Sequence, residues 1–158
     1  MTESRCSKRN IAFDIQDAEA LKMEECHKWL KFAKADFDSA KYLNDGPIHP
    51  KPLEIICYHS QQAAEKAVKA VIVFLGGQGS IPKVHNIVFL LRQVENILRD
   101  KKGLSIEEGI IERGEQLTRY SVAPRYPGEI HIDESETEKA LRDAEAFLQW
   151  ANDVISPK

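Results

Sequence analysis

The stretch Tyr58–Leu75, with the sequence YHSQQAAEKAVKAVIVFL, constrains the fold more than any other part of the chain. It contains no glycine or proline and is rich in helix-forming residues, so it predicts a single α-helix. At about 100° per residue, one line along this helix holds Tyr58, Gln62, Glu65 and Lys69. A face of small apolar residues lies opposite that line. The last turns, from Val71 on, are apolar all round, which indicates burial on every side or against a second subunit.

Apolar residues repeat at helical spacing in four further segments. The predicted helices span about 24–43, 53–75, 86–99, 106–121 and 135–155. Gly109 and Gly114 weaken the fourth helix, and Ser135 with Glu138 predicts a capping box for the last one. Helices joined by short loops, without a convincing strand, predict an all-α antiparallel up-and-down bundle of four to five helices. Residues 24–156 would form this domain, and residues 1–23 a tail or a short docking helix.

Length and composition narrow the class of protein further. A chain of 158 residues has the size of one domain with one core, and its net charge of -3 gives no support for a sequence-wide affinity for nucleic acid or membranes. The three cysteines form no CxxC motif, which fits a reducing compartment. The N-terminus lacks the apolar core of a signal peptide, and no stretch approaches the roughly 20 apolar residues of a membrane span. We therefore expect a soluble cytoplasmic protein that does not act at a membrane.

Asp36 is the first candidate for a site, because it falls on the apolar face of the first predicted helix. A carboxylate there needs a cationic or hydrogen-bonding partner, which Lys66, Lys69 or Arg125 could supply. We hypothesise a polar cleft that is lined by Asp36, Gln62, Lys66, Lys69, Arg125 and Tyr126. Its cations could hold a phosphate, while tyrosines stack on a base. The competing interpretation is a buried polar network that fixes helix register and binds nothing.

Four motifs along the chain carry a resemblance to a known family. The first predicted helix holds Trp29, Ala33, Asp36 and Phe37. The second holds Gln61, Gln62, Ala63, Glu65, Lys66, Lys69 and Ala70. His85 and Asn86 precede the third helix, and Arg125, Tyr126 and Pro127 lie in the loop before the last one. In this order the motifs resemble the prokaryotic HEPN domain (higher eukaryotes and prokaryotes nucleotide-binding) over roughly residues 24–155.

The resemblance implies a helical bundle that is usually a homodimer. It also implies one of two functions. Some members of the family are proposed to bind nucleotides or to act as partners of minimal nucleotidyltransferases, and others are RNA-cleaving toxins. The cleaving members carry Arg-x(4–6)-His near the start of the last helix, a spacing that Arg125 and His131 fit formally.

Arg125 and His131 could act together on RNA, with the histidine as acid or base and the arginine stabilising phosphorane charge. The intervening YPGEI contains proline and glycine, so we expect this pair on a loop and favour a structural role for it. We also expect His85 to cap or anchor its loop, and we find no residue spacing for a metal or a cofactor. The leading prediction is a non-catalytic binding protein for a nucleotide or a nucleotidyltransferase, which could belong to a toxin–antitoxin-type pair. The alternatives are an RNA-cleaving toxin and a structural interaction module.

Overall fold

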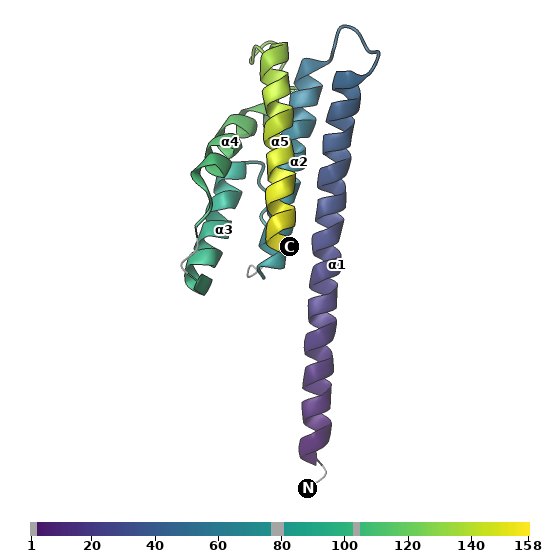
Figure 1. The fold of residues 1–158 in the computed structure, drawn as a ribbon, viewed down its shortest axis with the longest axis vertical. Coiled ribbons are helices and arrows are strands. Elements are labelled where there is room, and N and C mark those ends of the chain that lie inside the picture. The colour runs from purple at the N-terminus through teal and green to yellow at the C-terminus, as the bar shows by residue number, and fades with distance from the viewer. Residues whose placement is uncertain (1–2, 77–80, 103–104) are drawn as a thin grey trace.

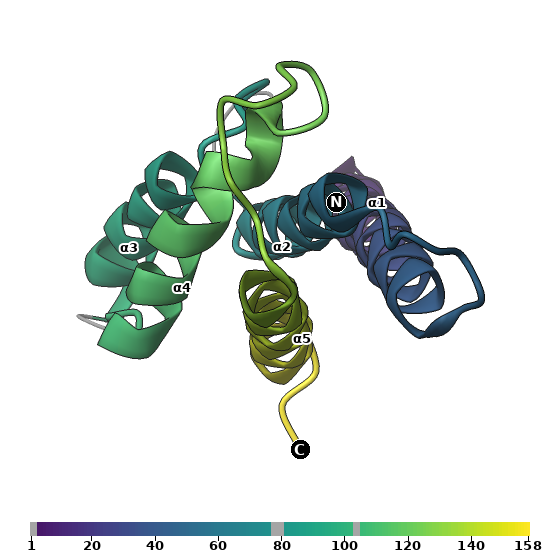
Figure 2. The same cartoon turned by 90° about the horizontal axis from the view of Figure 1, so that it is seen from above.

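The computed structural model describes residues 3–76, 81–102 and 105–158, and its elements within these ranges are helices joined by loops. The α-helices are α1 (Glu3–Asp45), α2 (Leu53–Phe74), α3 (Ile87–Lys102), α4 (Glu108–Thr118) and α5 (Glu134–Ile155), with the short 3-10 helix η1 (Arg119–Val122) after α4. The prediction of an all-α fold of four to five helices is confirmed, with five α-helices in the described ranges. Helices α1, α2 and α5 lie side by side, and α3 with α4 pack on the other side of α2 (Figures 1 and 2). None of the helices in these ranges combines the length and apolar character that a membrane span requires.

Helix α2 is the centre of the core because its small residues allow close approach of its neighbours. Ala63, Ala64, Ala67 and Ala70 are all fully buried. Among the described residues, Phe147 of α5 is the largest fully buried side chain, and it lies near Gly114 of α4. A Cβ at residue 114 would come within 3.0 Å of Leu91 Cδ1, so glycine there permits the contact between α4 and the core. The predicted burial at the end of α2 holds for Val71 and Ile72, whereas the following residues are half-buried.

Helix α1 is much longer than the predicted 24–43 segment. Residues 3–23, expected as a tail or a short docking helix, continue the same helix. Firm contact with the bundle begins near Cys26, whose Sγ donates to the carbonyl oxygen of Ala70 at 3.4 Å. Figure 1 shows the N-terminal part of α1 extending well past the other helices. We refer to residues 3–21 as the arm.

The start of α5 differs from the predicted capping box at Ser135 and Glu138. Asp133 is the N-cap, and its carboxylate accepts from the backbone N–H of Glu136 at 2.8 Å. The Glu136 side chain in turn accepts a hydrogen bond from the Asp133 backbone N–H at 3.4 Å. The box therefore begins two residues earlier, because this register turns Thr137 and Ala140 into the core.

Candidate functional site

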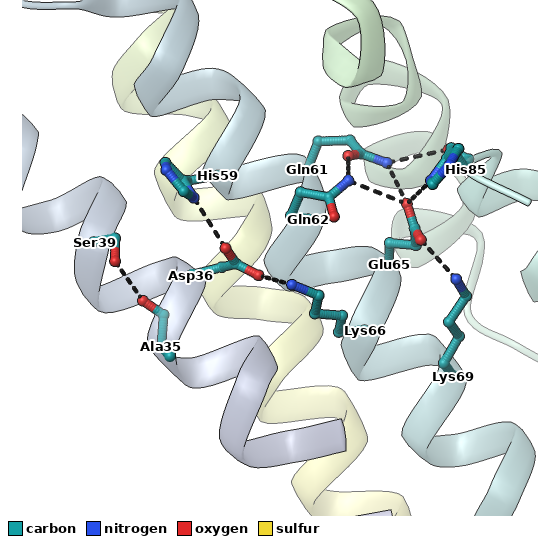
Figure 3. A network of polar contacts seen from close by, with 10 residues as sticks. All are labelled: Ala35, Asp36, Ser39, His59, Gln61, Gln62, Glu65, Lys66, Lys69 and His85. Carbon is teal, nitrogen blue, oxygen red and sulfur yellow. Dashed lines mark hydrogen bonds and ion pairs between the residues drawn. The ribbon is translucent and has the colours of Figure 1, made fainter. Parts of the chain in front are cut away.

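Asp36 is the centre of a charged cluster between α1 and α2 (Figure 3). Lys66 Nζ donates to Asp36 Oδ2, and His59 Nδ1 lies 2.9 Å from Asp36 Oδ1. The prediction that Asp36 has a cationic partner is confirmed for Lys66, while His59 was not predicted. Side-chain exposures of 14% for Asp36, 25% for Lys66 and 30% for His59 leave this cluster accessible to solvent at its edge.

Glu65 is the centre of a second and deeper cluster. Its carboxylate, only 3% exposed, accepts from Lys69 Nζ at 2.7 Å and from Gln61 Nε2 at 3.0 Å. His85 Nδ1 lies 3.3 Å from the same carboxylate, and Gln61 Nε2 also donates to the His85 carbonyl oxygen at 3.1 Å. These bonds tie α2 to the segment before α3, so the predicted anchoring role of His85 has a structural basis. Lys69 Nζ also lies 5.5 Å from the centre of the Trp29 ring, within cation–π range.

The two clusters together form what we call the polar row. Its members are Asp36, His59, Gln61, Gln62, Glu65, Lys66, Lys69 and His85. The row brings together four of the predicted site residues, namely Asp36, Gln62, Lys66 and Lys69, but around two separate carboxylates. Gln62 joins the second cluster, because its Nε2 donates to Gln61 Oε1 at 2.8 Å. The i,i+4 spacing of residues 61, 65 and 69 was the available sequence signal for this second cluster.

Charge within the polar row is already balanced by the protein itself. Lys66 is opposed by Asp36, and Lys69 is opposed by Glu65. Among the described residues, every buried side-chain nitrogen or oxygen has a hydrogen-bond partner. A phosphate placed in the row would compete with these carboxylates for the lysines. The polar row is thus better suited to a neutral polar group, which can both donate and accept hydrogen bonds, than to a free anion.

Arg125, Tyr126 and His131 lie in the irregular segment between η1 and α5. All three side chains are exposed, so the prediction that Arg125 and His131 lie on a loop is confirmed. Within the described parts of the chain, the Arg125 side chain makes no hydrogen bond or ion pair with the polar row or with any carboxylate. Arg125 is therefore a cation available to an incoming anion. The same ranges contain no cluster of three or more histidine, cysteine, aspartate or glutamate residues that could hold a metal ion.

Comparison with known proteins establishes the family. Residues 26–154 match the family model described as the HEPN domain, and the chain belongs to that family. A curated relative from Methanocaldococcus jannaschii, named "Putative toxin MJ1304", is 30% identical over 147 residues, which cover 82% of this chain and 88% of the relative.

Two solved structures share the fold. One is an archaeal HEPN homologue, ST0689, with a TM-score of 0.61 and 24% identity over 83% of this chain and 98% of that one. The other is TT1696 from Thermus thermophilus, with a TM-score of 0.62 and 23% identity over 82% of this chain and 97% of that one.

Proposed function

We propose that this HEPN protein acts by binding rather than by catalysis, as one component of a toxin–antitoxin-type pair. The ligand would be a nucleotide, a minimal nucleotidyltransferase partner, or both in succession. The observation that carries the proposal is the Asp36–Lys66–His59 cluster, which combines three ionisable groups from two helices at a solvent-accessible edge.

The chemistry of the polar row favours particular groups on the ligand. Carboxylates such as that of Asp36 accept hydrogen bonds from ribose hydroxyls or from a partner's amides, and Gln62 can both donate and accept. Arg125 would supply the bidentate donor for a phosphate, and Tyr126, which is 53% exposed, an aromatic face for a base. This division of roles leaves the lysines as positioning groups that hold the carboxylates.

Titration calorimetry with ATP, and gel filtration with a minimal nucleotidyltransferase where one is encoded beside this protein, test the proposal. Arg125→Ala should weaken ATP binding at least about tenfold, the loss expected for one charge-assisted contact. Lys66→Met should also weaken ATP binding, because it removes the cation that holds the Asp36 carboxylate in place. Lys34→Met is the matched control, because Lys34 makes an exposed ion pair with Asp38 on the same helix as Asp36. Failure of the wild type to bind either ligand would leave only a structural role for the polar row.

RNA cleavage is the second candidate, favoured by the printed name of the curated relative and by the joint exposure of Arg125 and His131. His131 would exchange a proton with a 2′-hydroxyl while Arg125 stabilises the developing phosphorane charge. The loop that carries both residues includes Pro127 and Gly128, the latter at a φ of 85°. Arg125 and His131 are thus carried by a loop rather than by a helix.

A further inference from the structure

The arm of α1 projects away from the bundle, and the side chains of residues 14–21 are all exposed. Figure 1 shows it projecting past the bundle, and Leu21 is 65% exposed. Most helical stability in proteins comes from the packing of an apolar face against a neighbour. The family match begins at residue 26, so the arm lies outside it. Exposed apolar side chains such as Leu21 need a surface to cover them.

A continuous stripe of exposed positions runs from the arm onto the outer side of α1. Its positions are separated by steps of three and four residues, the spacing of a two-helix coiled coil. This outer stripe consists of Ala18, Leu21, Glu25, Lys28, Phe32, Ala35, Ser39 and Tyr42, all exposed. Phe32 is 61% exposed and Tyr42 69%, although both are large and partly apolar. The bundle instead packs against Cys26, Ala33 and Ala40 on the other side of the helix.

Charge along α1 selects how such a stripe can pair. Residues 14–25 hold five carboxylates and one lysine, whereas residues 26–35 hold three lysines and no carboxylate. A parallel pair of α1 helices would place each block against its like. An antiparallel pair places the acidic block of one helix against the basic block of the other, which is the attractive arrangement.

One antiparallel register also matches the side chains. In this register Leu21 of one copy faces Phe32 of the second copy. Ala18 then faces Ala35, and Glu25 faces Lys28. Each contact occurs twice because of the two-fold symmetry. Apolar groups meet apolar groups and opposite charges meet across the centre.

We propose that two copies of this chain associate through antiparallel pairing of their α1 helices along the outer stripe. The arm of each copy covers Phe32 and Ala35 of the other. Since bundle contacts begin near Cys26, close to the symmetry point, the two bundles lie at opposite ends of the pair and do not collide. This interface does not depend on the proposed binding function.

Sedimentation analysis of the full-length protein over a concentration series tests the interface through a charge swap. The wild type should reach twice the monomer mass of 17.9 kDa. Glu25→Lys and Lys28→Glu each place like charges opposite one another twice, and each should raise the dimer Kd at least about tenfold. The double variant Glu25→Lys/Lys28→Glu restores opposite charges and should bring the Kd back to within about threefold of the wild type. The double variant still lacks the exposed ion pair between Lys28 and Glu24 of the same helix. Recovery of its dimer Kd would therefore come from the contact between the two copies and not from this pair.

Leu21→Asp should yield a monomer that keeps its helical circular dichroism, because this position is exposed. Phe89→Asp on α3 is the matched control, since Phe89 is an exposed apolar residue outside the stripe, and it should leave the dimer intact. A wild type that stays monomeric at all concentrations overturns the proposal. A dimer that tolerates Leu21→Asp and Lys28→Glu, or a double variant that fails to recover, overturns it equally.

Discussion

The buried pair of Glu65 and Lys69 offers a direct test of the polar row as a structural unit. Lys69→Met removes the cation that lies 2.7 Å from a carboxylate of only 3% exposure. Removing one partner of a buried pair costs about 3–5 kcal/mol, because the remaining charge is left uncompensated. We expect the lower end, about 3 kcal/mol, since Gln61 and His85 still contact Glu65. Equilibrium unfolding in urea measures this change in the free energy of unfolding.

Lys34→Met is the matched control for this measurement. Lys34 and Asp38 also form an i,i+4 pair, at 2.6 Å, but their side chains are 69% and 56% exposed. Solvent screening limits such a pair to about 1 kcal/mol or less. The double variant Glu65→Gln/Lys69→Met removes the unpaired charge and should recover part of the stability lost in Lys69→Met. Equal losses in Lys69→Met and Lys34→Met would refute the inference that burial makes the Glu65 cluster important.

Three further predictions concern the core, the last helix and alkaline pH. Gly109→Ala should raise the free energy of unfolding by up to about 1 kcal/mol, because alanine favours the helix and nothing lies near the added Cβ. Gly114→Ala should lower it by about 1–3 kcal/mol, because the added Cβ overpacks against Leu91. Unfolding in urea measures both changes. Asp133→Ala should lower the free energy of unfolding by about 1 kcal/mol, because it removes the N-cap of α5. Asp133→Asn should lower it much less, because asparagine also caps helices, and thermal unfolding measures both changes. Burial raises the pKa of the Cys57 thiol from 9.0 to about 11, so the unfolded thiol ionises first and stability falls as pH rises from 9 to 11. The difference in the free energy of unfolding between the wild type and Cys57→Ala should therefore narrow from pH 9 to 11. A difference that stays constant over this range would contradict the raised pKa of Cys57.

The helices were predictable where apolar residues repeat regularly, but not in the arm. Helix α2 was predicted within one residue, because its sequence lacks helix breakers and has a continuous apolar face. The arm gives no such signal, since it projects past the bundle and has no core face to encode (Figure 1). The start of α5 was ambiguous for another reason: Asp133 with Glu136 and Ser135 with Glu138 both fit a capping box. Packing of Thr137 against the core decides between them.

The candidate site was predictable only in part. Periodicity placed Asp36 on a buried face, and electrostatics then required a cation, which Lys66 supplies. The i,i+4 spacing of Gln61 and Glu65 indicated a bond between them, but periodicity could not reveal that Gln61, off the predicted polar line, is fully buried. It also could not place Arg125, because an irregular loop has no repeat from which its position relative to α2 follows.

The central claim, that this protein binds rather than cleaves, is tested most directly by incubating the purified protein with RNA in metal-free buffer and resolving the products on a gel. Arg125→Ala and His131→Ala serve as the paired variants, because both positions are exposed and should not affect folding. We predict no cleavage that distinguishes the wild type from either variant. Cleavage by the wild type that is lost in both variants would contradict the account and assign Arg125 and His131 a catalytic role.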